Sequence, residues 1–284
     1  MKLNPSVMLF IIGMHSIPIF FRKECKFKKH FKLIIILWYL KCISITVGMH
    51  RLWTHRSFNT TRLIKVILMI LCNSTFEGSI TDWTTQHRMH HRFEHTDPSL
   101  DPYSITKGFL WAHIITHFYD KKSDKDYNAN YNIVLQELRE ERSRFDNILL
   151  YHEHKYYNFL MFINGIILPT IIFQKYYQDG LASSLVSTAI VSLITWHSTW
   201  SVNSFAHLIG DKPFRKEHTA VDNHLVSLIT SGEGYHNYHH TYPKDYKASR
   251  NLFCFNLTGI IIFLMSKLNL AWDLREANIK SNRY

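Results

Sequence analysis

Long apolar runs alternate with polar segments along this chain of 284 residues, and four of the runs are suited to cross a bilayer. Residues 3–21 and 181–203 contain no Asp, Glu, Lys or Arg, and residues 33–49 contain one charged residue, Lys41. Residues 159–175 are also apolar, although an asparagine and a proline interrupt them. Because a membrane-spanning helix needs about 17–25 residues, the pattern predicts four transmembrane helices, joined in two hairpins.

The segments outside these runs are mostly polar and predict a helical cap on the cytosolic side. The cap would consist of residues 50–158 and 204–284, which together with the spans form a single domain over residues 1–284. Residues 63–76 are apolar but hold a lysine, and we expect them to form a helix that lies at the membrane interface. The predicted fold class is therefore an all-α integral membrane protein.

Histidines are the most unusual feature of the composition, since the chain has 19 of them. Three clusters stand out, His-Arg-Leu-Trp-Thr-His at 50–55, His-Arg-Met-His-His at 87–91 and Gly-Glu-Gly-Tyr-His-Asn-Tyr-His-His at 232–240. On a helix, positions i, i+3 and i+4 share one face, and three imidazoles on one face favour a metal site over a packed core. The candidate ligands are His50, His55, His87, His90, His91, His236, His239 and His240. Eight nitrogens exceed the needs of one ion, so we expect two metals.

The order of clusters and spans also predicts the topology. The first cluster follows the second span, the second precedes the third span and the third follows the fourth, so two hairpins place all three on one side. Residues 22–32 hold six Lys or Arg, and the positive-inside rule would keep this loop in the cytoplasm. The clusters require it on the opposite side, and we give them precedence because splitting the ligands would destroy the site.

The residue types narrow the chemistry of the site. The four cysteines are scattered without a C-x-x-C pair, which argues against a disulfide framework or a thiolate zinc site. Structural zinc takes only four ligands, a transporter would place its ligands within the spans, and two-metal hydrolases use bridging carboxylates. Imidazole suits iron, copper, zinc and nickel, and a site this rich in imidazole indicates oxygen chemistry on iron.

In these motifs the chain resembles the membrane acyl-CoA desaturases. This is the stearoyl-CoA desaturase family, of delta-9 type. The three clusters resemble the histidine boxes of that family, and Asn-Ser-Phe-Ala-His-Leu-Ile-Gly at 203–210 resembles a further stretch that supplies His207. The resemblance runs from the first span to about Asp273. It implies two Fe²⁺ ions, the first bound by His50, His55, His87, His91 and His239. The second would be bound by His90, His207, His236 and His240, with Asn203 acting through a water molecule.

The resemblance also implies a reaction and its partners. A saturated fatty acyl-CoA would lose two hydrogens to give a cis double bond, with O₂ as oxidant. Two electrons would come from cytochrome b5, or an equivalent donor, and its NAD(P)H reductase. The protein would lie in the lipid bilayer of the endoplasmic reticulum with its site facing the cytosol, and no nucleic acid is expected. No segment resembles the cytochrome b5 domain that some members carry.

Three residues are candidates for contact with substrate. Trp200 matches a tryptophan that lies near the substrate in the family. Lys121 would attract phosphates. The family tends to have Arg-Lys where this chain has Asp120-Lys121. It also tends to have Arg-Asp directly before the second box, where this chain has Thr-Gln at 85–86. Trp38 lies about 18 Å below His50 along a helix, where it would close an acyl tunnel. The alternative for Trp38 is an interfacial anchor.

Two other functions use similar features. Membrane hydroxylases of alkyl or lipid chains carry similar boxes, and a non-enzymatic metal-binding or transport protein would also need histidines. The residues inside the boxes favour the desaturases.

Carboxylates commonly orient ligating histidines, and the candidates for this role are Glu77, Asp82, Glu94, Asp97 and Glu233. We expect no ligand role for the remaining histidines, His15, His30, His95, His113, His117, His152, His154, His197, His218 and His224.

Overall fold

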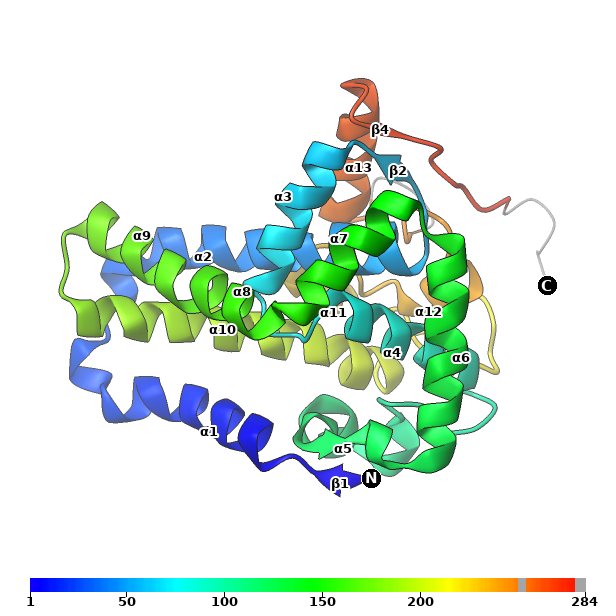
Figure 1. Cartoon of the computed structure of the whole chain (residues 1–284), viewed down its shortest axis with the longest axis horizontal. Coiled ribbons are helices and arrows are strands. Elements are labelled where there is room, and N and C mark those ends of the chain that lie inside the picture. The colour runs from blue at the N-terminus through cyan, green and yellow to red at the C-terminus, as the bar shows by residue number, and fades with distance from the viewer. Residues whose placement is uncertain (250–253, 279–284) are drawn as a thin grey trace.

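Long helices run side by side at one end of the molecule, and shorter helices gather at the other end (Figure 1). The computed structural model describes residues 1–249 and 254–278. The bundle contains α1 (Pro5–Phe20), α2 (Phe27–Ile43), α9 (Leu168–Tyr177) and α10 (Leu181–Ser204). The other helices form a cap at the end where α2 and α10 finish.

Three continuous helices in the described part of the chain are long and apolar enough to cross a membrane. The first has 28 residues, because α2 continues into the π-helix η2 (Ser44–Thr54). The second has 21 residues and joins α8 (Tyr157–Phe162), the π-helix η6 (Ile163–Ile167) and α9. The third has 27 residues, because α10 continues into the 3₁₀ turn η7 (Phe205–His207). These helices contain the second, third and fourth predicted spans.

The first predicted span, residues 3–21, forms the shorter helix α1. This helix is apolar but has only 16 residues, and the side chain of Asn4 caps its start by accepting from the backbone N–H of Val7. It is therefore below the length that the other three helices reach. Three of the four predicted spans are thus helices of sufficient length, and the layout of four transmembrane helices in two hairpins stays a prediction.

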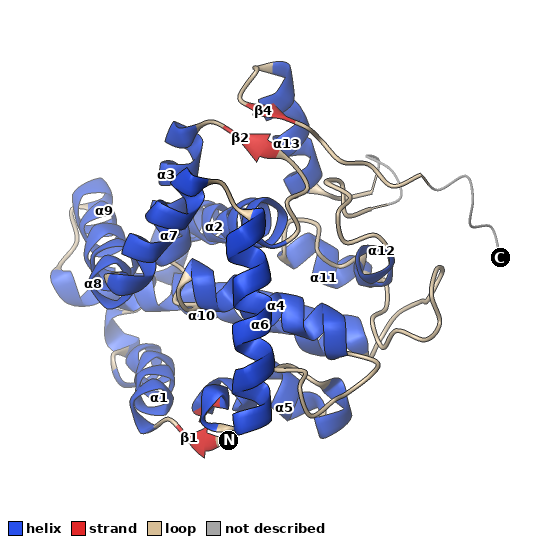
Figure 2. Cartoon of the chain, turned by 45° about the vertical axis from the view of Figure 1, so that its right-hand side comes forward, coloured by secondary structure: helices blue, strands red, loops and turns tan. Residues whose placement is uncertain are grey.

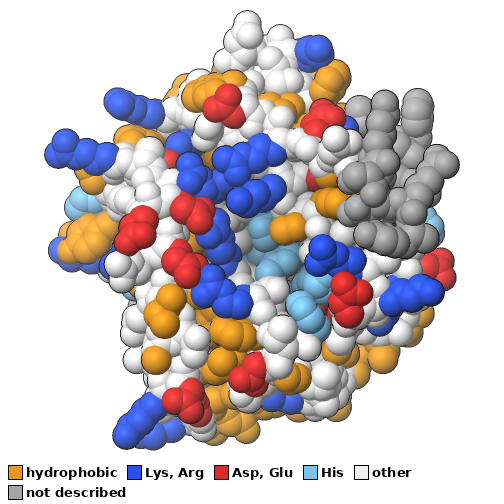
Figure 3. All heavy atoms as spheres, turned by 90° about the vertical axis from the view of Figure 1, so that its right-hand side faces the viewer, with side chains coloured by type: hydrophobic (Ala, Val, Ile, Leu, Met, Phe, Trp, Pro, Cys, Tyr) orange, Lys and Arg blue, Asp and Glu red, His pale blue; other side chains and the backbone are white. Residues whose placement is uncertain are grey.

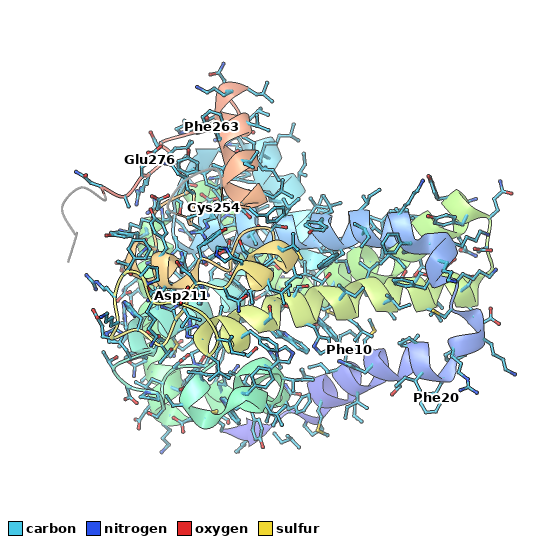
Figure 4. All side chains as sticks on the ribbon, turned by 180° about the vertical axis from the view of Figure 1, so that it is seen from behind. Phe10, Phe20, Asp211, Cys254, Phe263 and Glu276 are labelled. Atoms are coloured by element: carbon cyan, nitrogen blue, oxygen red, sulfur yellow. The ribbon has the colours of Figure 1, made fainter. Side chains whose placement is uncertain are left out.

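The helix α1 packs against α10 through its apolar side. Ile11 and Met14 of α1 are buried with Ala189 and Trp196 of α10. Phe10 also lies on this side, with its ring 5.9 Å from Trp196, whereas Phe20 is exposed at the far end of the helix (Figure 4).

The basic loop between α1 and α2 is tied to the turn between α9 and α10 at the far end of the bundle. The ammonium groups of Lys26 and Lys29 lie 2.8 and 2.9 Å from Oδ1 of Asp179, and Nε2 of His30 lies 2.7 Å from Oδ2. One carboxylate therefore binds two lysines and a histidine at this end of the bundle. It also links the two helical connections at that end.

The cap is built from short helices and two small antiparallel sheets (Figure 2). Its α-helices are α3 (Arg62–Asn73), α4 (Ile80–Phe93), α5 (Phe109–His113), α6 (Lys125–Glu141), α7 (Arg144–Lys155), α11 (His224–Ile229), α12 (His236–Thr241) and α13 (Leu257–Lys267). Its 3₁₀ turns are η3 (Ile105–Lys107), η4 (Ile115–Phe118) and η5 (Lys121–Ser123), while η1 (Arg22–Glu24) lies between α1 and α2. Strand β1 (Lys2–Leu3) pairs with β3 (Tyr119–Asp120), and β2 (Asn59–Thr60) pairs with β4 (Ala271–Trp272).

The helix α3 corresponds to the run at 63–76 that was predicted to lie along the interface. It is amphipathic, with Leu68 and Cys72 buried and Leu63 and Ile67 exposed. Thr61 caps its start by accepting from the N–H of Ile64. The amphipathic helix is therefore present, and its position at a membrane surface stays a prediction.

The largest hydrophobic core lies where the bundle meets the cap. It includes Met49, Trp53 and Phe58 from η2 and the residues that follow, packed with Ile80 of α4. Lys41 is buried just below this core, where its ammonium donates to Ser192 Oγ at 3.0 Å and lies 5.2 Å from the centre of the Phe76 ring. The charge of Lys41 is thus accommodated inside the protein.

Candidate metal centre

Three helices and one turn bring the clustered histidines together at the junction of bundle and cap. The π-helix η2 carries His50, and the N–H of His55 donates to the carbonyl of His50 at 3.1 Å, an i→i+5 bond. In a regular α-helix residues five apart diverge by about 140°. The wider π turn instead allows both imidazoles to face the same site, a common use of such segments.

The other two boxes lie on α4 and α12, and His207 lies on η7. Helix α4 begins at a side-chain cap, in which Ser79 accepts from the N–H of Asp82 at 3.1 Å. On a helix, adjacent residues such as His90 and His91 diverge by about 100°. The structure accordingly directs His91 to one group of ligands and His90 to another.

The imidazoles form two groups that each suit one metal ion. The first group contains His50, His55, His87, His91 and His239, and the second contains His90, His207, His236 and His240. Within each group the candidate ligand atoms all lie within 4.8 Å of one another. These are the two sets that the resemblance implies. Their binding to iron stays a prediction.

The spacing of the nitrogen atoms fits a metal. Nε2 of His239 lies 2.9 Å from Nε2 of both His50 and His91, and Nε2 of His236 lies 3.0 Å from that of His207. Two ligands at right angles on a metal bonded at about 2.1 Å lie about 3.0 Å apart. Nε2 of His90 is buried and has no hydrogen-bond partner among the described residues, as expected for an atom directed at an ion.

Burial keeps His87, His91 and His236 in the neutral form that binds metals. It lowers the pKa of His87, His91 and His236 well below the usual value for histidine, with neighbouring imidazoles adding to the effect. The rings are therefore neutral at pH 7, and a neutral imidazole has a lone pair available for a metal.

Several ligands are held by polar partners on their other nitrogen. Nδ1 of His50 lies 2.9 Å from Glu233, and Nδ1 of His90 lies 2.9 Å from Asp101. Nδ1 of His207 lies 2.7 Å from the hydroxyl of Thr219. Such bonds fix the tautomer and ring orientation, so that Nε2 faces the metal.

Glu233 and its neighbour Arg51 form a buried ion pair beside the first group. The guanidinium of Arg51 donates to Glu233 at 2.8 Å. Burial raises the pKa of Glu233, but Arg51 and His50 more than offset this, and the pKa lies below its usual value. Glu233 is therefore charged and can accept from His50 and Arg51 together.

Glu94 plays a comparable part beside the second group. It accepts from the N–H and hydroxyl of Thr219, each at 2.5 Å, and from Nδ1 of His218 at 2.9 Å. Its carboxylate thus supports His207 through Thr219. Glu94, His218 and His240 also lie close enough to form a third possible ligand group.

The sequence reasoning identified two of the supporting carboxylates and missed a third. Glu94 and Glu233 lie beside the ligands, whereas Asp82 pairs with Lys122 and Asp97 bonds Ser99. Asp101 was not anticipated, because it follows α4 in a segment without periodicity. Of the ten histidines given no ligand role, none belongs to the two groups described above.

Two adjoining cavities lead to the metal centre. The inner one has a volume of about 40 Å³ and touches His50, His87 and Asn203. The outer one, of about 690 Å³, is lined in part by Lys121 and Trp200. Lys121 is held by Gln86, whose Oε1 lies 3.2 Å from its ammonium.

Trp38 lines neither cavity. Its indole N–H donates to Ser198 of α10 at 3.0 Å, and it lies one helical turn before Cys42, which lines the inner cavity. This position is compatible with a closed end of the cavity, and the role of Trp38 in chain length stays a prediction.

The cap surface brings the site close to solvent. Figure 3 looks on to the cap and shows histidine side chains near its middle, beside Lys and Arg side chains. His91 is partly exposed, and Arg92, the residue after it, is exposed. The metal centre is thus nearest to the surface on this side.

Comparison with known proteins gives one consistent result. The family model for fatty acid desaturases matches residues 31–247. Acyl-CoA desaturase 1 of Saccharomyces cerevisiae is 31% identical over 277 residues, which is 96% of this chain and 52% of the yeast protein. Stearoyl-CoA desaturase of Sus scrofa is 33% identical over 87% of this chain and 68% of its own length. An acyl-CoA Delta12-desaturase of Acheta domesticus is 34% identical over 84% of this chain and 65% of its own length. The chain therefore spans from about half to about two thirds of these relatives.

Proposed function

The chain belongs to the fatty acid desaturase family, and on this basis we propose that it is an O₂-dependent acyl-CoA desaturase with two Fe²⁺ ions in its histidine groups. The observation that carries the proposal is the convergence of nine buried or nearly buried imidazoles in two groups of five and four, of which His50 and His87 line the narrow inner cavity. When bound, the irons would supply activation of O₂. The residues of the chain would bind the acyl group and hold it against them.

The balance of the reaction is that of a four-electron reduction of O₂. Two adjacent C–H bonds of a saturated chain are lost to form a cis double bond, which yields two electrons and two protons. Two further electrons and two protons are supplied from outside, and O₂ leaves as two molecules of water. The narrow inner cavity beside His50 and His87 would expose one pair of methylenes and exclude bulk water.

We place the double bond at the delta-9 position of the acyl chain. The support is a relative in Caenorhabditis elegans that is named as a Delta(9)-fatty-acid desaturase and is 33% identical over 81% of this chain. The cricket relative is named as a Delta12-desaturase, so family membership alone leaves the position open and the product must be located directly.

We propose cytochrome b5, reduced by its NAD(P)H reductase, as the electron donor. The partly exposed His91 lies on the cap, and Lys and Arg side chains lie beside the histidines on this face (Figure 3), which suits an acidic partner docking there. This partner implies the endoplasmic reticulum membrane, with the cap in the cytosol.

Asn203 would act on the second iron through a water molecule, and Lys121 and Trp200 would contact the substrate.

The test is to incubate membranes containing the chain with labelled stearoyl-CoA, NADH and O₂, and then to locate any new double bond. A Δ9 monounsaturated product is expected, and it should be absent without O₂. A hydroxylated product would identify the chain as a membrane hydroxylase instead. Metal analysis of the active protein should give close to two irons per chain, and active protein containing zinc alone would contradict the iron assignment.

A further inference from the structure

The two cavities meet at a narrow place formed by polar side chains, which we call the neck. Glu77, Tyr103 and His117 line both cavities. The outer cavity is about 690 Å³ and reaches the ammonium groups of Lys121 and Lys122, whereas the inner one is about 40 Å³. A bulky charged group therefore fits only on the outer side of the neck, and only a narrow chain fits on the inner side.

Glu77 is held at the neck by the loop between α3 and α4. The preceding residue, Phe76, has a φ of 62°, in the left-handed region that non-glycine residues rarely adopt. The Phe76 ring is packed 5.5 Å from Phe10, and it lies so close to Gly165 that a Cβ there would meet it at 2.4 Å. This packing holds the strained turn. Oε1 of Glu77 is buried without a hydrogen-bond partner among the described residues.

His117 is held on the other side of the neck, in the turn η4. Its ring stacks on that of Trp200, with ring centres 4.7 Å apart and planes inclined by 25°. Nε2 of His117 is likewise buried and has no hydrogen-bond partner among the residues that the structure describes. Two buried polar atoms without partners at one place are uncommon in folded proteins, and here they border the substrate path.

Both groups are neutral at pH 7. Burial raises the pKa of Glu77 to about 8, and burial together with the nearby Lys121 lowers the pKa of His117 well below its usual value. A carboxylic acid and a neutral imidazole can each donate one hydrogen bond. Neutral donors in a buried place suit a neutral oxygen better than a carboxylate, which would have to shed its water.

We propose that Glu77 and His117 bind the carbonyl oxygen of the substrate's thioester at the neck, an inference that rests on the proposed function. The carrier then lies in the outer cavity beside Lys121, and the acyl chain enters the inner cavity toward His50 and His87. Because the carbonyl is fixed, the distance from the neck to the metal ligands sets how many carbons precede the oxidised bond. Glu77 and His117 are thus positioning residues for the choice of bond.

The direct test compares two ligands that differ only in this oxygen. Stearoyl-CoA carries the thioester carbonyl, and S-octadecyl-CoA has a methylene in its place. Binding of each to the full chain in lipid nanodiscs is measured without reductant, so that no turnover takes place. The wild-type chain should bind stearoyl-CoA about tenfold more tightly than the thioether, the size of effect that a pair of hydrogen bonds gives.

Variants assign the preference to the neck. Glu77→Leu and His117→Leu should each reduce the preference to about threefold, and the double variant should abolish it, with binding of the thioether unchanged. Glu77→Gln keeps a neutral donor and should retain most of the preference. His113→Leu is the matched control, since His113 bonds Ser204 at 2.9 Å and lines neither cavity.

Unchanged binding of the thioether also shows that a variant is folded. During turnover, the leucine variants at the neck should give double bonds at more than one position, whereas His113→Leu should give a single position. Equal binding of both ligands by the wild-type chain would overturn the neck subsite alone. Failure of the wild-type chain to bind either ligand would overturn the proposed function, and the subsite with it.

Discussion

Single side chains decide whether each iron would be held, and His207 is the most informative of them. It lies outside the three boxes, yet its Nε2 is 3.0 Å from that of His236 and its Nδ1 is fixed by Thr219. His207→Ala should abolish desaturation and reduce the iron content from about two per chain toward one. Activity and bound iron are measured on the same purified protein.

The matched control is His197→Ala, ten residues earlier in the same helix. His197 bonds two histidines that belong to neither group, with nitrogens 3.2 Å from His15 and 3.0 Å from His113. It should retain two irons and most of its activity. If both variants lost activity equally while retaining iron, His207 would not be a ligand.

The residue scale also shows where sequence reasoning stops. The family resemblance implied different metals for His90 and His91, and the angle of about 100° between neighbours on a helix agrees with that assignment. Asp101 and His117 were not recognised, since their roles depend on which segments meet in space. Asp101 reaches His90 across a turn, and His117 reaches the neck from a 3₁₀ segment.

At the scale of elements, the two π-helical segments were not predicted. The apolar pattern of 33–49 gives a helix but does not reveal that it widens at Ser44, which is what allows His50 and His55 to converge. The hydrogen-bond register of a helix interior has no sequence signal comparable to a cap residue. The second, third and fourth predicted spans coincide with helices that are long and apolar enough to cross a membrane, because a long apolar run has few alternatives.

The second π-helical segment gives a prediction about close packing between elements. Gly165 lies in η6 against the Phe76 ring, and a Cβ there would meet the ring at 2.4 Å. Gly165→Ala should destabilise the protein by about 1–3 kcal/mol, the usual cost of overpacking. The measurement is thermal unfolding in detergent at fixed lipid content.

Gly13 of α1 provides the control for this change. A Cβ at Gly13 has nothing within 4 Å, so Gly13→Ala should leave stability unchanged or raise it by up to about 1 kcal/mol through helix propensity. Equal loss of stability in both variants would show that the contact between η6 and the loop at Phe76 is unimportant.

For the molecule as a whole, the metal centre joins the bundle to the cap. Its candidate ligands come from η2 and the residue after it, from α4, from η7 and from α12, segments that are far apart in the sequence. Binding of metal to the folded state alone adds its binding free energy to stability. Removing iron with a chelator should therefore lower the midpoint of thermal unfolding by several degrees, and restoring Fe²⁺ should reverse the change. An unchanged midpoint would show that the histidines are held in place without metal.

The whole substrate path, from the cap surface into the bundle, leads to the last prediction. The acyl chain would pass the neck and the inner cavity and continue toward Cys42, below which Trp38 is fixed to α10 by its bond to Ser198. Trp38→Ala removes the side chain that would close this end, so the preference should shift from eighteen-carbon toward longer acyl-CoAs. The neighbouring Tyr39 bonds the carbonyl of Leu228 at 3.0 Å and lines neither cavity, so Tyr39→Ala should leave the preference unchanged. Competition between acyl-CoAs of increasing length measures the shift. An unchanged preference in Trp38→Ala, with less protein recovered in the membrane, would instead identify Trp38 as an interfacial anchor, because aromatic residues at that boundary stabilise insertion without contacting substrate.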